Sequence, residues 1–258
     1  MGFHLVRLAA CLGAIGLATA ALPAGAGEIK VFSAEAPRDA LEHVAAQFEK
    51  TTGHKITFEF MTAGQVRGKI DAGENADLAV ASSGVIAEMV KSGKAGDATN
   101  LGRIGLAMAV RDDAPSPDIS TTEKFVAVLR AAKSVSFTDP AAGGTAGLYF
   151  FGLLEKLGVA DDVKKKAVFS KGGRDAAQKV ASGAAEVGIT FPSEIAPIKG
   201  AKVGGMLPPE VQNYVIYAAV IPAKAANAEI ARAFVAALIA QQSREGWTAA
   251  GFEPLGGK

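Results

Sequence analysis

The chain has 258 residues, with 27 basic and 26 acidic side chains, a formal net charge of +1 and 49% hydrophobic residues. A balanced charge argues against a general nucleic-acid binder and against a protein that binds anionic membranes. The length allows one or two domains with full hydrophobic cores.

The N-terminus has the pattern of a secretory signal. Arg7 is followed by an apolar run from Leu8 to Leu22 and then by a small-residue triplet at 24–26. This order predicts a signal peptide over residues 1–26, removed before Gly27, and a periplasmic location. A membrane anchor is disfavoured because the run is shorter than the roughly 20 residues that a spanning helix needs. A lipid-accepting box ending at Cys11 is disfavoured because it precedes most of the apolar run.

Strands and helices alternate through the first half of the remaining chain. Apolar residues of the segment 37–53 recur at Leu41, Val44 and Phe48, which is typical of a one-sided helix. We expect strands at 28–34, 55–60, 76–82 and 104–110, and further helices at 64–73 and around 85–90.

The second half repeats this alternation. Ser120 and Glu123 form a capping box before a helix that ends near Ala132. We expect strands at 134–137, 166–169, 186–191 and 213–223, and helices at 146–157, 176–183, 192–198 and after Asn227.

This order of elements predicts an α/β protein with two largely parallel or mixed sheets. The runs 104–118 and 213–223 are the segments that could carry the chain from one sheet to the other. We therefore expect a discontinuous first lobe, residues 27–108 plus 218–258, around a second lobe of residues 109–217. We expect the protein to be a monomer.

Four strand-to-helix turns carry small or polar residues. In open α/β sheets such turns lie at the carboxyl ends of strands, where ligands collect, and the N–H groups of a helix start attract anions. Two turns from each lobe would form an anion cradle of backbone amides; the alternative is that each turn is an ordinary tight turn. The candidate residues in these turns are Ser33, Glu35, Ala36, Thr62, Ala63, Gly64, Thr145, Ala146, Gly147 and Gly173.

Three other side chains are candidates for the same cleft. Arg67 and Arg174 lie just inside helix starts, where a cation is unfavourable unless an anion is near; the alternative is a solvated arginine. Phe191 ends a predicted strand and would form a wall of the cleft.

A catalytic site finds little support in the residues. After the signal segment the chain keeps only His43 and His54, and it has no nucleophile elbow and no zinc-ligand spacing. We expect a protein that is not an enzyme and that needs no metal or cofactor. The alternative is an exported hydrolase that uses Asp139 or His43 on an anionic substrate.

Several segments resemble the periplasmic molybdate-binding proteins of ABC importers. They are "IKVFSAEAPRDAL", "GQVRGKIDAGENADLAVAS", "TDPAAGGTAGLYFFGLLEKLG", "GGRDAAQKVASGAAEVGIT" and "AAGFEPL", in the order of that family and across essentially the whole chain after residue 26. The resemblance implies a type II periplasmic binding fold, with two lobes joined by a two-segment hinge that close over a tetrahedral oxyanion. It also implies an ABC permease of the inner membrane as partner.

The family combines backbone amides with two serine hydroxyls and one tyrosine hydroxyl, and this chain departs from that pattern. The serine positions fall on Ala36 and Ala63, and the tyrosine position falls on Phe191; Ala146 and Gly173 match the backbone donors of the third and fourth turns. Ser33, Thr62 and Thr145 could replace a hydroxyl in part. Arg67 and Arg174 could instead bind a carboxylate or phosphate bidentately. The resemblance thus implies import of a molybdate-like anion. One alternative is that the same fold binds an organic di- or tricarboxylate. Another is that the protein serves sensing in place of import.

Overall fold

The structure is a computed structural model that describes residues 25–255. All of the predicted signal peptide except its last two residues lies outside the described range. Within residues 25–255, no helix is both long enough and apolar enough to cross a membrane.

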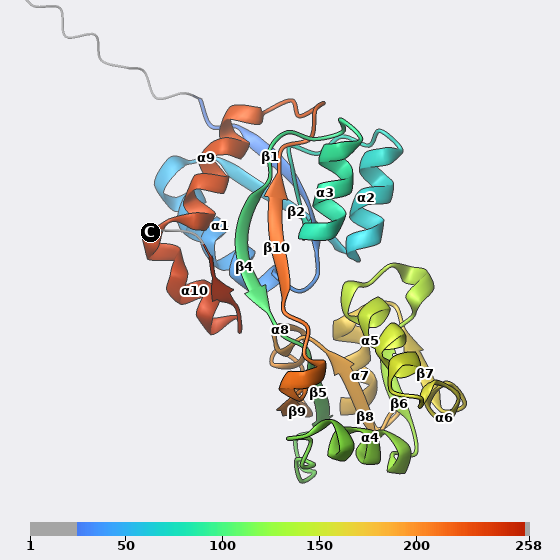
Figure 1. Cartoon of the computed structure of the whole chain (residues 1–258). Helices are drawn as coiled ribbons and strands as arrows, with labels where there is room; N and C mark the ends of the chain where they lie inside the picture. Colours follow the sequence, from blue (N-terminus) through green and yellow to red (C-terminus); the bar gives the residue numbers. More distant parts are fainter. Residues whose placement is uncertain (1–24, 256–258) are drawn as a thin grey trace, which may run out of the picture.

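Two mixed sheets form two lobes, one above the other in Figure 1. The first sheet has the order β11-β4-β10-β3-β1-β2, and the second has the order β7-β6-β8-β5-β9. The strands of the first sheet are β1 (Glu28–Ala34), β2 (Lys55–Met61), β3 (Leu78–Ser82), β4 (Thr99–Ile104), β10 (Val215–Val220) and β11 (Glu253–Pro254). Those of the second are β5 (Ala107–Arg111), β6 (Val135–Thr138), β7 (Ala167–Ser170), β8 (Val187–Thr190) and β9 (Ala201–Met206).

Each sheet has a parallel part that feeds helices and an antiparallel part next to the crossing point. β1 is parallel to β2 and β3, whereas β10 runs antiparallel to β3 and β4. In the second sheet β6 is parallel to β7 and β8, whereas β5 runs antiparallel to β8 and β9. The expectation of an α/β protein with two mixed sheets is confirmed.

Helices cover both sheets, with apolar faces packed on a core that runs through both lobes. In the first lobe α1 packs against α9 and α10, and α2 packs against α3. In the second lobe α5 and α6 pack together, as do α7 and α8. The helices are α1 (Arg38–Thr52), α2 (Ala63–Asp71), α3 (Ser83–Lys91), α4 (Thr122–Ala131), α5 (Thr145–Lys156), α6 (Ala160–Lys164), α7 (Gly173–Ala181), α8 (Pro192–Ile195), α9 (Ala228–Ile239) and α10 (Arg244–Ala249), with short 3-10 turns η1 (Pro140–Ala142), η2 (Pro209–Val211) and η3 (Gln241–Ser243).

The chain passes between the sheets twice, at 105–106 and at 207–214. The strand expected over 104–110 is therefore wrong as a single strand: β4 ends at Ile104 and β5 begins at Ala107. Residues 107–108 belong to the second sheet and residues 215–217 to the first, so the sheets change a few residues earlier than the expected lobe boundaries.

One side chain joins the two linking segments. The Gln212 carboxamide accepts a hydrogen bond from the Leu106 amide at 2.7 Å and donates one to the Leu106 carbonyl oxygen at 3.0 Å. Gly105 leaves the room for this contact, because a Cβ there would lie 3.0 Å from the Gln212 side chain. The expected strand is thus interrupted at the point where the Gln212 side chain joins the two segments that link the lobes.

Candidate functional site

A small cavity of about 20 Å³ lies where the helix-bearing turns of the two lobes meet. A space of this size holds one water molecule, since a water needs roughly 10–15 Å³ of such volume. Its lining comes from all four turns that the sequence singles out. The lining residues are Ala34, Glu35, Ala36, Met61, Thr62, Ala63, Thr138, Gly144, Thr145, Ala146, Gly172, Gly173, Phe191, Glu194 and Tyr217.

Helix starts supply most of this lining. Ala63, Thr145 and Gly173 are the first residues of α2, α5 and α7, and Ala36 lies two residues before α1. Among the described residues, none accepts a hydrogen bond from the amides of Ala36, Ala63, Ala146 or Gly173. Unpaired N–H groups at helix starts carry a partial positive charge, so the cavity is polarised to hold negative charge.

Local capping explains why these helices begin at the cavity. Thr62 caps α2 reciprocally: its hydroxyl accepts from the Gln65 amide, and the Gln65 side chain accepts from the Thr62 amide at 2.9 Å. Glycines occupy the cap positions of α5 and α7, where Gly144 and Gly172 have extended backbone. Gly144 leaves room for the neighbouring β6, because a Cβ there would lie 2.6 Å from the Thr138 side chain.

Two of the predicted residues use their polar groups to join the lobes. The Thr62 hydroxyl donates to the Ala142 carbonyl oxygen at 2.5 Å, and the Gly64 amide donates to the Gly143 carbonyl oxygen at 3.1 Å. Gly64 does not line the cavity, and its amide is occupied by neighbouring main chain. The expectation that Gly64 faces a ligand is therefore corrected: the N-cap and first turn of α2 touch the turn before α5.

Three other candidates lie away from the cavity. The Ser33 side chain is fully buried and donates to the Ala34 carbonyl oxygen at 2.9 Å. Arg67 is exposed and pairs with Asp71 at 3.3 Å, because it lies a full turn beyond the start of α2. Gly147 packs on β6, where a Cβ would overlap the Thr138 carbonyl oxygen. None of the three lines the cavity, which corrects their expected roles.

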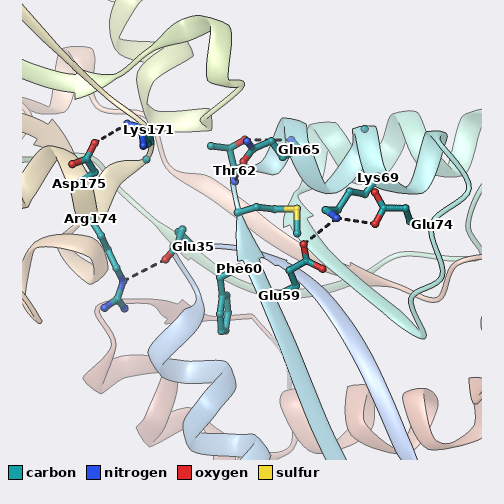
Figure 2. A pocket seen from close by; sticks show the side chains of 13 residues that line it. Glu35, Glu59, Phe60, Thr62, Gln65, Lys69, Glu74, Lys171, Arg174 and Asp175 are labelled. Atoms are coloured by element: carbon teal, nitrogen blue, oxygen red, sulfur yellow. Dashed lines mark hydrogen bonds and ion pairs between the residues drawn. The ribbon is translucent and has the colours of Figure 1, made fainter.

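Arg174 and Glu35 also differ from expectation, because they form an ion pair with each other. Arg174 also pairs with a second acid, and Glu35 also pairs with a second base. Arg174 Nη2 lies 2.6 Å from Asp39 Oδ1, and Arg174 Nε lies 3.5 Å from Glu35 Oε2 (Figure 2). Glu35 in turn accepts two hydrogen bonds from Arg38, at 3.1 and 2.8 Å. Arg174 is thus an arginine of α7 held by acids of the first lobe, rather than a free anion clamp.

Tyr217 and Glu194 are cavity residues that the sequence reasoning missed. Tyr217 lies on β10, is 2% exposed, and meets the Phe191 ring edge-on at 6.0 Å between centroids. Burial raises the pKa of its hydroxyl well above the ordinary value, and a hydrogen bond with Thr145 opposes that shift. Tyr217 therefore brings a phenol hydroxyl to the cavity beside Phe191, where the resemblance implies that one was lost.

Glu194 is a buried acid in the wall of the same cavity. It is 5% exposed, and its Oε2 atom accepts from the Thr190 hydroxyl and, at 3.5 Å, from the Phe191 amide. Burial raises the pKa of Glu194 to about 7, the two hydrogen bonds lower it, and the charge of Glu35 raises it further. One signal in the sequence could have found it, since Glu194 stands third in the helix α8 that follows β8, with Phe191 as its N-cap.

A second, larger pocket of about 680 Å³ adjoins the cavity (Figure 2). Glu35, Met61, Thr62 and Gly172 line both spaces. The pocket also receives the Lys69 ammonium, which pairs with Glu59 at 3.0 Å and with Glu74 at 2.7 Å. Its remaining lining residues are Glu59, Phe60, Gln65, Gly68, Lys69, Glu74, Lys171, Arg174 and Asp175.

The residues of the hydrolase alternative lie outside both spaces. Asp139 accepts from the Ala141 amide at 2.9 Å and shapes the turn after β6. His43 contacts the Gln47 side chain at 2.9 Å and lies against Gly246, in a separate surface pocket. The described residues bring neither one next to a partner nucleophile or base.

The family model described as "Bacterial extracellular solute-binding protein" matches residues 29–253. The chain belongs to the bacterial extracellular solute-binding proteins. Within them it is a divergent member of the molybdate-binding-like group. It is 30% identical over 197 residues to the molybdate-binding protein ModA of Azotobacter vinelandii, covering 76% of this chain and 75% of that protein.

Two further comparisons bear on this solute-binding protein. It is 26% identical over 253 residues to an aconitate isomerase of a Pseudomonas species, covering 95% of each chain. The solved structure of the periplasmic molybdate-binding protein of Azotobacter vinelandii superposes with a TM-score of 0.69 at 21% identity, over 87% of this chain and 98% of the other. The fold is therefore that of the two-lobed type II periplasmic binding proteins.

Proposed function

We propose that the protein is exported to the periplasm, binds a small anion between its lobes and delivers it to an ABC permease. The observation that carries this proposal is the meeting of unpaired amides from four separate helix starts at one cavity. A tetrahedral oxyanion, with four oxygens, needs several times the room of one water. The lobes must therefore separate for the anion to enter. Once the anion is bound, its contacts with both lobes would favour the closed form.

The geometry favours an organic polycarboxylate over molybdate as the ligand. The serine hydroxyls of the molybdate-binding family are replaced by Ala36 and Ala63, and the hydroxyl groups that line the cavity belong to Thr62, Thr138, Thr145 and Tyr217. The hydroxyls of Thr62 and Thr145 already donate to Ala142 and Ser82. The adjoining pocket has room for the rest of an organic acid. It also holds Lys171, whose ammonium no described residue pairs. A second carboxylate that extends from the cavity could meet this ammonium.

Calorimetry with molybdate, tungstate, sulfate, phosphate, citrate and both aconitates tests the proposal. We expect a polycarboxylate to bind most tightly. No heat with any of these anions would contradict the anion site, and tightest binding of molybdate would contradict the assignment of ligand class. Native mass spectrometry of the protein isolated from its own periplasm would show which acid it carries.

Ala63→Pro removes one amide donor with little change in the helix. Proline suits the first position of a helix, where the N–H is unpaired, and Thr62 before it is already extended. A hydrogen bond to a charged group contributes about 1.5–3 kcal/mol, so we expect binding of the preferred anion to weaken by about 10- to 100-fold. Calorimetry measures the loss.

The matched control is Thr122→Pro, at the first position of α4 and outside both the cavity and the adjoining pocket. It should leave anion affinity unchanged. Equal affinities for Ala63→Pro and the wild type would show that the Ala63 amide does not contact the anion.

A second candidate function is isomerisation of an unsaturated polycarboxylate. The relative named aconitate isomerase is similar over 95% of the chain, and Glu194 supplies a buried carboxyl with a pKa of about 7 in the cavity. Such a group can take a proton from a carbon next to a double bond and return it to the far end of the same three-carbon unit. The double bond then shifts, and no atom is gained or lost.

Proton NMR of cis-aconitate with the protein in D₂O tests this candidate. Formation of the trans isomer with deuterium at carbon, absent with Glu194→Gln, would support isomerisation. Binding of cis-aconitate with no turnover over a day would leave the binding protein as the function and exclude this activity.

A further inference from the structure

Glu194 lines the candidate site and has one carboxylate oxygen with no hydrogen bond to a described residue. Its Oε2 atom is held by the Thr190 hydroxyl and the Phe191 amide, whereas no described residue forms a hydrogen bond with Oε1. Gly173 is what allows this placement, because a Cβ there would overlap Glu194 Oε2 and Thr190 Oγ1. The carboxyl group thus shares the cavity with the amides at the start of α7.

The charges that face Glu194 do not neutralise it. Glu35 of the turn after β1 carries a like charge, and Tyr217 of β10 is a neutral phenol. Within the described part of the chain, Arg174 of α7 is the one cation that acts on Glu194, and its guanidinium is held by Asp39 and Glu35. No basic group of residues 25–255 lies within 4 Å of the Glu194 carboxylate oxygens as an ion-pair partner.

An ionised Glu194 would therefore oppose the anion that the surrounding amides attract. Two negative charges that share a site with little water cannot both persist, and the weaker acid takes up a proton. A protonated carboxyl group gains an O–H donor, which an anion can accept. Glu194 lines the cavity, and Oε1 is the oxygen left free to carry such a donor.

We infer that Glu194 is a neutral carboxylic acid when the proposed anion is bound, that it donates a hydrogen bond to this anion, and that binding takes up one proton. The inference rests on the proposed anion site and names the side chain that selects ligands there. The site accepts an anion that has an unprotonated oxygen. The proton of the Glu194 carboxyl group takes the place of a hydroxyl donor that the family has and this chain lacks. Burial, which raises the pKa of Glu194 to about 7, makes the protonation easy near neutral pH.

The first test needs no ligand. In protein labelled with carbon-13 at the glutamate carboxyl groups, one resonance should titrate near neutral pH and be missing from Glu194→Gln. Glu88→Gln, at an exposed position of α3, is the matched control and should keep that resonance. Titration of every glutamate at ordinary acidic pH would overturn the inference.

The second test counts protons in calorimetry with molybdate and sulfate at about pH 6 and about pH 8, and with trans-aconitate only at about pH 8, where its three carboxyl groups are ionised. Titrations in two buffers of different ionisation enthalpy give the proton uptake. With the wild type and Glu88→Gln we expect nearly one proton at about pH 8 and little uptake at about pH 6. Affinity should fall about tenfold between those values, because one pH unit beyond the pKa changes it tenfold.

Glu194→Gln keeps a donor at the same place without a titratable proton. We expect it to bind with no proton uptake and with affinities at the two pH values that agree within about twofold. Binding by the wild type with no uptake would overturn the inference while leaving the anion site intact. No binding of any of the three anions would overturn the proposed site and the inference with it.

Discussion

Replacement of Gly173 by alanine is expected to destabilise the protein by about 3 kcal/mol and to abolish anion binding. A methyl group at this position would overlap Glu194 Oε2 and Thr190 Oγ1, which are both buried. Overpacking of a filled site costs about 1–3 kcal/mol, and displacement of Glu194 would also break its hydrogen bonds to Thr190 and Phe191. Urea unfolding measures the loss in stability, and calorimetry measures the loss of binding.

The neighbouring Gly172 provides the control. A Cβ at Gly172 would meet nothing within 4 Å, and its φ of −175° is extended backbone that any residue adopts. In urea unfolding, the free energy of unfolding of Gly172→Ala should therefore agree with that of the wild type within about 0.5 kcal/mol. Equal stabilities of Gly173→Ala and Gly172→Ala would contradict the packing around Glu194 described above.

Replacement of Glu194 by glutamine is expected to stabilise the unliganded protein at alkaline pH. The folded pKa of about 7 lies above the value of 4.5 for an exposed glutamate, so the folded state binds this proton more tightly than the unfolded state. Its contribution to stability is complete below pH 4.5 and is lost as the pH rises to 7. At about pH 8 the ionised, buried carboxylate costs about 3 kcal/mol, which glutamine avoids.

Urea unfolding at about pH 5 and pH 8 measures this effect. The gain in free energy of unfolding for Glu194→Gln should be small at the lower pH and approach about 3 kcal/mol at the higher one. Glu88→Gln, on the exposed side of α3, should follow the wild type at both. A gain that is the same at the two pH values would show that Glu194 does not titrate differently on folding.

Much of the fold follows from periodicity in the sequence, and the failures have local causes. The apolar faces of α1, α4 and α9 are plain in the sequence because each helix covers one side of a sheet. β9 was missed because Gly204 and Gly205 interrupt its pattern; Val110 and Ile119 lie where their side chains would be. The break between β4 and β5 depends on Gln212, which lies 106 residues further along the chain than Leu106.

The site was predictable at the level of backbone turns and not at the level of side chains. Ala36, Ala63, Ala146 and Gly173 follow strands, and strand ends of both lobes meet at one edge, so their arrangement is a property of the topology. The direction of a side chain depends on partners from the other lobe, as with Arg174 and Asp39. Tyr217 and Glu194 were missed because they reach the cavity from β10, which was interpreted as a run linking the lobes, and from the four-residue helix α8, to which no site residue was assigned.

The double hydrogen bond between Gln212 and Leu106 limits how the molecule can deform. Because the oxygen and the NH2 group of one carboxamide both bond to the main chain of Leu106, the two linking segments cannot slide past each other without breaking both bonds. Torsion of one lobe about the long axis would require such sliding, whereas flexing the paired segments together would not. The motion that keeps both bonds is therefore an opening in which the two linking segments flex together.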